Sequence, residues 1–137
     1  MEAVFESFQA GLPHLILHLA TATVVWAVGL WVYLFITPHD ELKLVREGNI
    51  SAAISFAGIS LAIAVPLGFA LSGSVNVIDI AVWGLLTVIL QLIAFRVIDM
   101  LLGNLSARIE RDERAAAIAL TALKLSVAAL TSAAVAL

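Results

Sequence analysis

Residues 14–37 read HLILHLATATVVWAVGLWVYLFIT and contain no Asp, Glu, Lys or Arg. Pro13 and Pro38 stand on either side of this stretch. An apolar run of about 20 residues is long enough to cross the hydrocarbon core of a bilayer as a helix. Lipid offers no hydrogen-bond partner for peptide groups, so a run of this length crosses it as a helix. The stretch therefore predicts a transmembrane helix.

Three further runs of the same kind follow. They extend from about Ile50 to Ser72, from about Val77 to Leu102, and from near Ala115 to Leu137. Together the four runs occupy most of the chain and leave two short charged loops and one tight turn. The sequence predicts an all-α membrane protein, a bundle of four transmembrane helices.

The composition leads to the same fold class. Of the 137 residues, 63% are hydrophobic and 12% are charged, and there is no cysteine. A soluble domain carries about 25% charged residues, so a soluble single-domain enzyme is not expected. Seven Lys and Arg stand against ten Asp and Glu, which argues against a nucleic-acid partner. Without cysteine there is no disulfide, thiolate metal site or thiol catalysis.

The basic residues of the loops predict the orientation of the spans. Lys43 and Arg46 lie in the first charged loop, and Arg108, Arg111 and Arg114 lie in the second. The N-terminal tail (1–13), the turn (73–76) and the C-terminus contain no Lys or Arg. Loops rich in Lys and Arg stay in the cytoplasm. We therefore expect both charged loops to be cytoplasmic and both chain ends to lie outside.

A shift of 64 residues aligns the second half of the chain with the first. Ala52-Ala53-Ile54 falls on Ala116-Ala117-Ile118, and Thr23-Val24 falls on Thr87-Val88. Each half holds two spans, so both halves enter the membrane in the same direction. This pattern predicts two tandem, parallel two-helix repeats, at 14–72 and 77–137, joined by the turn at 73–76.

The spans differ in side-chain size. Spans one and three are bulky and contain all three Trp residues, whereas spans two and four are rich in Ala, Ser and Gly. Small residues let helix backbones approach closely in lipid. We therefore expect spans two and four at the centre of the bundle or at a subunit interface, and we expect a homo-oligomer, a dimer or higher.

Several motifs resemble a known family. They are Thr37-Pro38-His39-Asp40-Glu41, Asn49-x-x-Ala52-Ala53, and Asp79 with Trp83-Gly84 and Gln91-Leu92. In this order and spacing, the chain from about residue 30 to 135 resembles the bacterial inner-membrane family called domain of unknown function 350 (YjfL-type). The resemblance implies a cytoplasmic-membrane protein built from tandem two-helix units, without an established activity.

The last span departs from the family pattern. Asp112-Glu113-Arg114 replaces an Asn-containing entry to this helix, and Lys124 stands where similar proteins carry a small residue. Lys124 lies about nine residues into the span, roughly 13 Å deep at 1.5 Å per residue. A lysine at the bilayer centre costs at least about 2.5 kcal/mol, so it should face the bundle interior or water. It is either part of a proton or anion path, or a packing lysine that snorkels outwards or loses its proton.

Other polar residues within the spans are weaker candidates for a path. Ser60 is the counterpart of Lys124 in the first repeat. Pro66 frees a carbonyl near Ala62 that could bind a cation or form a hinge, although a static kink is the simpler interpretation. Gln91 suits a hydrogen bond between helices. Asp79 could reach Lys124 only if the helices are adjacent, and its role stays open.

The remaining candidates have simpler interpretations. Arg96 and Asp99 lie three residues apart, as in a local ion pair. His14 and His18 have the i, i+4 spacing of a metal site, but no convincing third ligand accompanies them, so we expect neither a metal nor a cofactor. The charges of residues 108–114 alternate as in a solvated helical extension of the last span.

Two functions follow from these features. The first is an ion or small-solute channel or transporter, with a path near Ser60, Pro66 and Lys124. The alternative is a membrane scaffold that recruits a cytoplasmic protein through loops 38–49 and 103–114. Besides the lipid bilayer and further copies of the chain, that protein is the one partner class the sequence suggests. No grouping of residues has catalytic spacing, so we do not expect an enzyme.

Overall fold

The computed structural model describes residues 1–136 and is entirely helical over them, apart from short connections. Its helices are α1 (Glu2–Ile36), α2 (Glu41–Arg46), α3 (Ile50–Gly73), α4 (Val77–Leu102), α5 (Leu105–Glu110) and α6 (Arg114–Val135). The helices α1, α3, α4 and α6 are long and apolar enough to cross a membrane. The predicted all-α class and the four spans are confirmed. Leu137, the expected end of the last span, lies outside the described residues.

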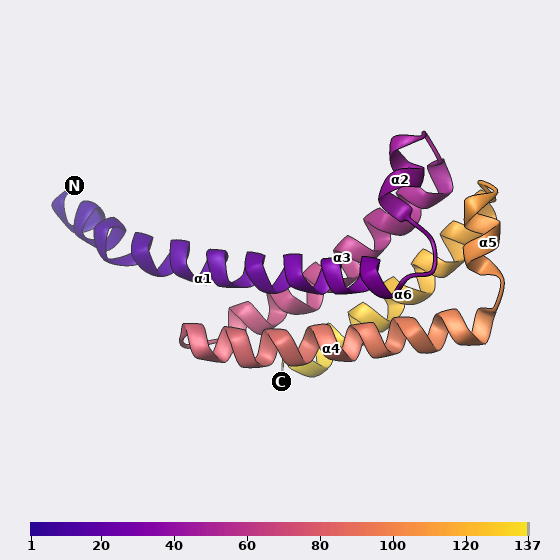
Figure 1. The fold of residues 1–137 in the computed structure, drawn as a ribbon. Helices are drawn as coiled ribbons and strands as arrows, with labels where there is room; N and C mark the ends of the chain where they lie inside the picture. Colours follow the sequence, from indigo (N-terminus) through magenta and orange to yellow (C-terminus); the bar gives the residue numbers. More distant parts are fainter. Residues whose placement is uncertain (137) are drawn as a thin grey trace.

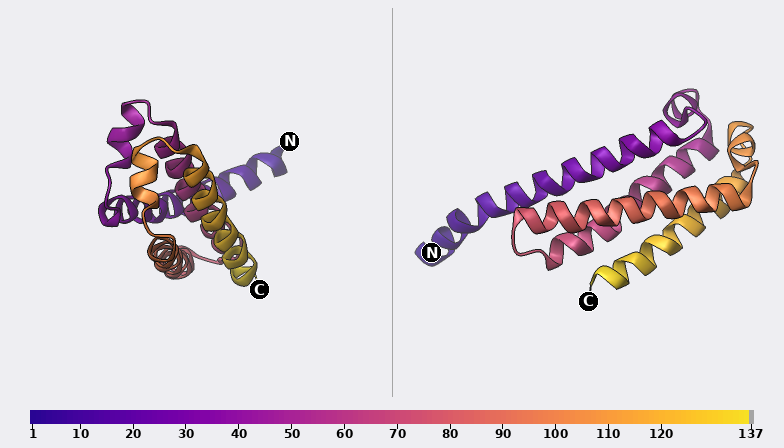
Figure 2. Two further views of the ribbon diagram at one scale, coloured as in Figure 1. Left: turned by 90° about the vertical axis from the view of Figure 1, so that its right-hand side faces the viewer. Right: turned by 60° about the horizontal axis from the view of Figure 1, so that its bottom comes forward.

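The four long helices form one elongated bundle (Figures 1 and 2). Helix α3 is central: it packs most extensively on α6 and also contacts α1 and α4. The short helices α2 and α5 lie together at one end, which we call the loop end. The turn between α3 and α4 and both ends of the chain lie towards the other end (Figure 1). This arrangement places both charged segments on the same side of the apolar bundle.

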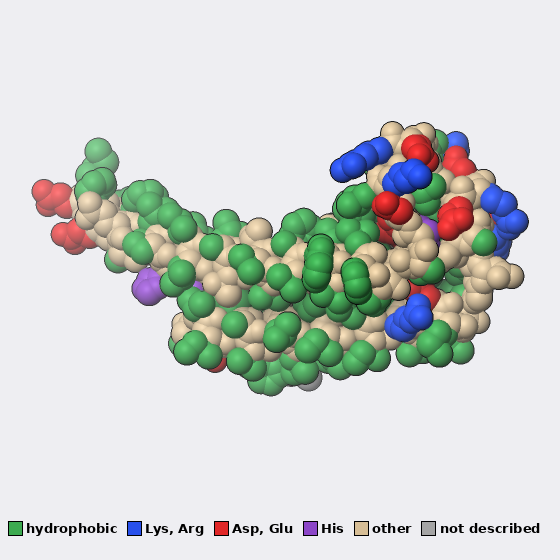
Figure 3. Space-filling model, viewed as in Figure 1, with side chains coloured by type: hydrophobic (Ala, Val, Ile, Leu, Met, Phe, Trp, Pro, Cys, Tyr) green, Lys and Arg blue, Asp and Glu red, His purple; other side chains and the backbone are tan. Residues whose placement is uncertain are grey.

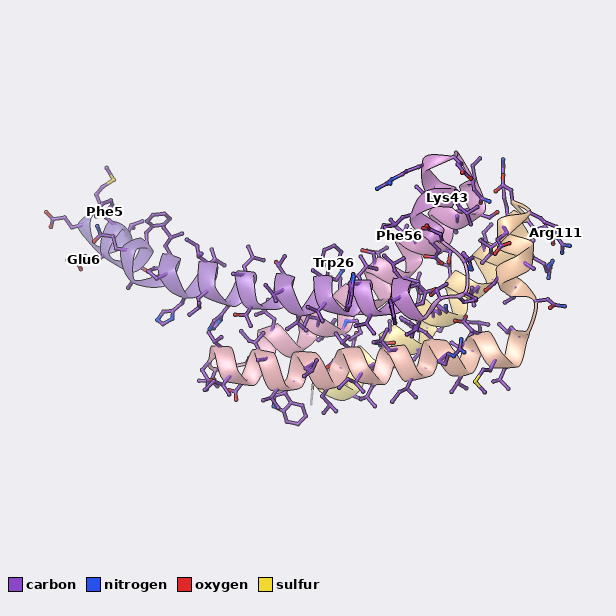
Figure 4. All side chains as sticks on the ribbon, viewed as in Figure 1. Phe5, Glu6, Trp26, Lys43, Phe56 and Arg111 are labelled. Atoms are coloured by element: carbon purple, nitrogen blue, oxygen red, sulfur yellow. The ribbon has the colours of Figure 1, made fainter. Side chains whose placement is uncertain are left out.

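The surface separates charge from apolar side chains along the long axis. Figure 3 shows Lys, Arg, Asp and Glu gathered over α2 and α5, hydrophobic side chains along the middle, and acidic side chains at the N-terminal end of α1. Figure 4 places Lys43 and Arg111 at the loop end, far from Phe5 and Glu6. An apolar middle between two polar ends is the pattern of a membrane-spanning bundle.

Helix α1 is longer than the sequence predicts. It begins at Glu2 and continues through Pro13, which we expected to precede the first span. At 1.5 Å per residue its 35 residues extend about 52 Å, well beyond the hydrocarbon core of about 30 Å. The N-terminal end accordingly projects past the other helices (Figure 2). Residues 1–13, expected as a tail, are thus largely a helical continuation of the first span.

Both charged loops fold into a short helix followed by a tight turn. Gly48 after α2 and Asp112 after α5 have φ values of 87° and 58°, in the left-handed region. Helix α5 begins 64 residues after α2, and α6 begins 64 residues after α3. The break at Asp112 separates α5 from α6, so residues 108–114 do not extend the last span as expected. The predicted two-unit repeat agrees with these spacings and stays a prediction.

Small residues bring α3 and α6 into close contact. A Cβ atom on Gly58 of α3 would overlap the side chain of Thr121 of α6, and the Thr121 hydroxyl lies 3.4 Å from the carbonyl oxygen of Ile54. Helix α3 is the most buried of the four long helices but still exposes one face, which includes Ala53, Ala57 and Leu61, and α6, expected like α3 at the centre or at a subunit interface, buries one face only. The opposite face of α6 exposes a stripe of small residues: Ala115, Ala119, Ala122, Ser126, Ala129 and Ala133.

Candidate functional site

Lys124 points into the bundle and forms an ion pair there. The residue is 1% exposed, and its Nζ atom lies 2.9 Å from Oδ1 of Asp99 on α4. The rings of Tyr33 and Phe95 flank the ammonium, with centroids 5.0 Å and 5.3 Å from Nζ. Aromatic faces at this distance stabilise a cation. Lys124 therefore faces the interior, held by one carboxylate and two rings.

A chain of hydrogen bonds continues from Lys124 across the bundle. Lys124 Nζ donates to the hydroxyl of Tyr33 at 3.3 Å, and this hydroxyl donates to Oε1 of Glu41 at 3.3 Å. The Ser55 hydroxyl donates to the same Glu41 oxygen at 3.0 Å. Glu41 is 1% exposed, so this carboxylate is buried and held by two hydroxyl donors. The chain links α1, α2, α3 and α6.

His39 completes this group. It is buried in the link between α1 and α2, with Nε2 3.3 Å from Oε1 of Glu41. We call the set the charged cluster; it consists of Tyr33, His39, Glu41, Ser55, Asp99 and Lys124. It is built from every long helix and from α2, and it lies near the loop end of the bundle.

The local sequence explains how the link aims these side chains inwards. Pro38 disfavours helical backbone in the residue before it, and α1 ends at Ile36 with Thr37 in an extended conformation. The Asp40 side chain then accepts a hydrogen bond from the backbone N–H of Lys43 and caps α2. Because α2 packs on α3, Glu41 in its first turn meets Ser55.

The inner face of α4 carries further polar groups. Thr87 and Gln91 are buried on successive turns that lead towards Asp99. Gln91 is fully buried, and within residues 1–136 neither of its amide atoms has a hydrogen-bond partner. Buried amide groups are normally satisfied by protein or by ordered water. This part of the buried face of α4 therefore offers hydrogen-bonding capacity that residues 1–136 do not fill.

A cavity lies at each end of this polar face. The one at the loop end has a volume of about 310 Å³, and its lining includes Asp99, Arg96 and Pro38. The other, near the α3–α4 turn, has a volume of about 390 Å³, and its lining includes Thr87 of α4 and Thr131 of α6. Polar side chains thus stand in both cavities, with Gln91 and Lys124 between them along α4 and α6.

Asp79 lies far from Lys124. Its carboxylate accepts hydrogen bonds from Asn76 Nδ2 at 3.2 Å and from the Val75 backbone N–H at 3.3 Å, in the turn before α4. Asp79 and Asp99 are about 30 Å apart along the helix at 1.5 Å per residue, so Asp79 does not reach the cluster. Asp99 pairs with Lys124, and within the described residues no Arg96–Asp99 ion pair forms.

The candidates on α3 do not join the charged cluster. The backbone carbonyl of Ser60 accepts a hydrogen bond from the indole N–H of Trp26 at 3.2 Å, and Trp26 is labelled on α1 in Figure 4. Pro66 is buried within α3, which continues through it to Gly73. Among the hydrogen bonds of residues 1–136, none connects the side chain of Ser60 to the cluster.

The two histidines of α1 lie side by side outside the cluster. The ring centroids of His14 and His18 are 6.3 Å apart. In the part of the chain that the structure describes, no three His, Cys, Asp or Glu residues are grouped so that they could hold a metal ion.

Polar contacts at the loop end tie the two charged segments together. Asn49 Nδ2 donates to the carbonyl oxygens of Ile109 at 3.0 Å and Glu110 at 3.1 Å. The Ser51 backbone N–H donates to Oδ1 of Asp112 at 2.8 Å, and this hydrogen bond lowers the pKa of the Asp112 carboxyl. Each contact joins residues about 60 positions apart, so the loop end is one connected unit.

Charged side chains of this unit also pair locally. Arg108 Nε lies 2.6 Å from Oε2 of Glu113, and Arg111 lies 3.3 Å from Oε1 of the same residue. The hydrogen bond from Arg108 lowers the pKa of the Glu113 carboxyl. Much of the loop-end charge is therefore paired within the chain.

Comparisons with known proteins agree with this architecture. A family model described as a domain of unknown function (DUF350) matches residues 7–135. The UPF0719 inner membrane protein YjfL of Escherichia coli strain K12 is 32% identical over 87 residues, which are 64% of this chain and 66% of that protein. The YjfL protein of Escherichia coli O157:H7 matches with the same figures.

The chain thus spans 66% of the length of these curated relatives. No solved structure matches it. Four apolar helices and relatives named as inner membrane proteins support a multi-pass inner-membrane protein. The match over nearly the whole chain shows that it belongs to the DUF350 family of domains of unknown function.

Proposed function

We propose that this protein carries ions, or small solutes whose passage is coupled to ions, across the inner membrane. The observation that carries the proposal is the Lys124–Asp99 pair. The ammonium is 1% exposed, whereas the Asp99 side chain is 26% exposed and lines the loop-end cavity. Ionisable residues inside a membrane bundle are costly and typically mark ion pathways or proton relays.

The polar face of α4 supplies the rest of the proposed path. From the loop-end cavity the path passes Asp99 and Lys124, then Gln91, and ends at the cavity beside Thr87 and Thr131. The amide of Gln91, which has no hydrogen-bond partner within residues 1–136, favours water beside this face of α4. Polar groups spaced between two cavities, with Phe95 between Gln91 and Asp99, support ion passage along this face.

This path differs from the one expected from the sequence. Lys124 and Gln91 are retained, whereas Ser60 and Pro66 lie on α3 without a contact to the cluster among the hydrogen bonds of residues 1–136. The proposed path therefore follows the α4–α6 interface.

We also propose that the loop end faces the cytoplasm and that the protein works as an oligomer. All Lys and Arg of the loops lie on this side, as the positive-inside rule requires of a cytoplasmic face. The exposed stripe of small residues on α6, centred on Ala122 and Ser126, suits close packing against the same helix of a second copy. A Cys at position 122 should then form an intermolecular disulfide, and a Cys at Ile93, exposed on α4, should not.

The alternative function is a scaffold that binds a cytoplasmic protein through the loop end. The charged side chains of the loop end favour the scaffold function, because they gather on one surface (Figure 3). However, Arg108 and Arg111 both pair with Glu113, which leaves less charge for a partner. The scaffold also assigns no role to the buried ion pair, so we rank it second. Neither function includes catalysis.

A flux measurement in liposomes tests the proposal. Purified protein is reconstituted, and H⁺, Na⁺, K⁺ and Cl⁻ gradients are imposed in turn, with protein-free vesicles as the baseline. The native chain should dissipate at least one gradient, Lys124→Met should reduce that flux at least tenfold, and Lys43→Met, at an exposed lysine, should retain it. A folded native protein that dissipates none of the gradients would refute the proposal and favour the scaffold.

A further inference from the structure

The His39–Glu41 pair has unfilled hydrogen-bonding capacity in a buried place. His39 Nε2 lies 3.3 Å from Glu41 Oε1, yet within residues 1–136 neither ring nitrogen has a hydrogen-bond partner. The second carboxylate oxygen of Glu41, Oε2, is also buried without a partner there. Both side chains are almost completely enclosed, at 4% and 0% exposure. Buried polar atoms are rarely left in this state.

The formal charges of the cluster show what is missing. Lys124 contributes one positive charge, and Asp99 and Glu41 contribute two negative charges. Tyr33 and Ser55 are neutral, and Arg96, which lines the same cavity as Asp99, lies exposed on α4. With a neutral imidazole the cluster keeps one excess negative charge, and a buried, unpaired charge is strongly unfavourable.

One proton on the imidazole removes the excess charge and supplies a donor for one of these contacts. The imidazolium neutralises the cluster, and its Nε2–H becomes a donor that faces Oε1 of Glu41 across the 3.3 Å contact. We propose that His39 is a proton-binding site of this protein, with the buried carboxylate of Glu41 as its counter-ion.

The position of Tyr33 connects this site to the ion pair. Its hydroxyl lies 3.3 Å from both Glu41 Oε1 and Lys124 Nζ. When His39 loses its proton, the Glu41 carboxylate is left without its counter-ion and attracts the ammonium of Lys124 through this hydroxyl, in competition with Asp99. This link between His39 and the ion pair rests on the proposed function. It identifies the proton as the ion to which passage is coupled.

The chain allows His39 to be observed alone. His14, His18 and His39 are its three histidines, and His14 and His18 lie on α1 away from the cluster. In the variant H14Q/H18Q, NMR of ¹³C-labelled imidazole follows the charge of His39 in reconstituted protein between pH 5 and 9. We expect the ring to change its charge state within this interval. A ring that keeps one charge state throughout would overturn the proposal.

Removing the counter-ion tests the pairing. In H14Q/H18Q carrying Glu41→Gln, the midpoint of the His39 transition should move to lower pH by about one unit or more, because an opposite charge at this distance is lost. Glu47→Gln removes the charge of an exposed carboxylate directly after α2, and it should leave the midpoint of the His39 transition unchanged. Equal midpoints in the two variants would contradict the role of Glu41.

A second variant covers the case in which Glu41→Gln does not fold. Ser55→Ala keeps the carboxylate and removes one of its donors, so the midpoint of His39 should rise, and an unchanged midpoint would count against the pairing. These NMR measurements do not depend on ion flux through the protein. A His39 that titrates with Glu41 in a protein that passes no ion would refute the proposed function and leave the proton site standing.

Discussion

Lys124 of α6 and Asp99 of α4 form an ion pair whose two members differ in their access to solvent. The ammonium is 1% exposed and lies 2.9 Å from a carboxylate whose side chain is 26% exposed. Tyr33 and Phe95 cover the ammonium with their rings. Of the two partners, Asp99 lines the loop-end cavity and Lys124 does not. If either side chain were removed, the other would be an uncompensated charge inside the bundle.

A double-mutant cycle measures how strongly the two charges depend on each other. Lys124→Met and Asp99→Asn should each destabilise the protein, and the double variant should be more stable than the sum of the single effects implies. Because Asp99 is partly solvated, we expect a coupling energy of about 1–3 kcal/mol. Thermal unfolding in detergent micelles gives the four stabilities.

The exposed Lys43–Glu47 pair is the control for this cycle. Its atoms lie 4.0 Å apart, and both side chains are more than half exposed. Exposed pairs contribute about 0–1 kcal/mol, so the Lys43→Met/Glu47→Gln cycle should show little coupling. Equal coupling energies in the two cycles would show that burial does not strengthen the Lys124–Asp99 interaction.

Gly58 tests the close packing of α3 against α6. A Cβ at this position would overlap Thr121, whose branched side chain has little rotational freedom in a helix. Gly58→Ala should therefore destabilise the bundle by about 1–3 kcal/mol. Gly68 on the same helix is exposed, and among residues 1–136 no atom lies within 4 Å of the place that a Cβ would take apart from its own helix, so Gly68→Ala should be neutral or stabilising. A Gly58→Ala protein as stable as Gly68→Ala would contradict this packing.

Asp112 gives the loop end a defined pH dependence. Its hydrogen bond from the Ser51 backbone N–H lowers the pKa of the carboxyl in the folded protein. A carboxyl with a lowered folded pKa stabilises the protein above its unfolded pKa of about 3.9, and this contribution disappears as the pH falls through the folded pKa. Asp112→Asn, which also tolerates the positive φ, should therefore be less stable than the native protein at pH 7.

This difference should vanish in acid. Unfolding midpoints at pH 7 and at several values below pH 4 measure it, with Glu110→Gln as the control at a neighbouring exposed carboxylate. A gap between Asp112→Asn and the native protein that stays constant over this range would show that the Asp112 charge does not contribute.

The four spans could be predicted from sequence because length and hydropathy determine them. The expected stretch from Val77 to Leu102 coincides with α4, and the stretch from Ile50 to Ser72 ends one residue before α3 does. An interior position for Lys124 could also be predicted, from the cost of exposing a lysine to lipid. These features depend on local composition and not on how the helices are rotated.

The partners of Lys124 could not be predicted in this way. Asp79 and Asp99 lie on the same helix, and the choice between them depends on the tilt of α6 against α4. Glu41 stands in a segment expected as a loop, and it enters the cluster only because α2 folds back onto α3. In the sequence, Tyr33 is one of several bulky residues in a span that is expected to face lipid. From the sequence alone, a buried Lys124 needs a carboxylate partner, but the sequence does not indicate which Asp or Glu supplies it.

The absence of native cysteine makes the orientation directly testable. Single cysteines at Val75, exposed in the α3–α4 turn, and at Glu110, exposed at the loop end, can be labelled with a membrane-impermeant maleimide. In intact cells Val75→Cys should react, and Glu110→Cys should react only after the membrane is opened, because basic loops stay in the cytoplasm. The reverse pattern would place the loop end outside.

Flux through the double variant Lys124→Met/Asp99→Asn separates a role in passage from a role in stability. Replacing a buried ion pair by neutral side chains often costs little stability, so this protein should fold and reconstitute like the native chain. We expect its flux in liposomes to fall at least tenfold for the ion that the native protein passes. A double variant that conducts as well as the native protein would show that the buried pair takes no part in passage.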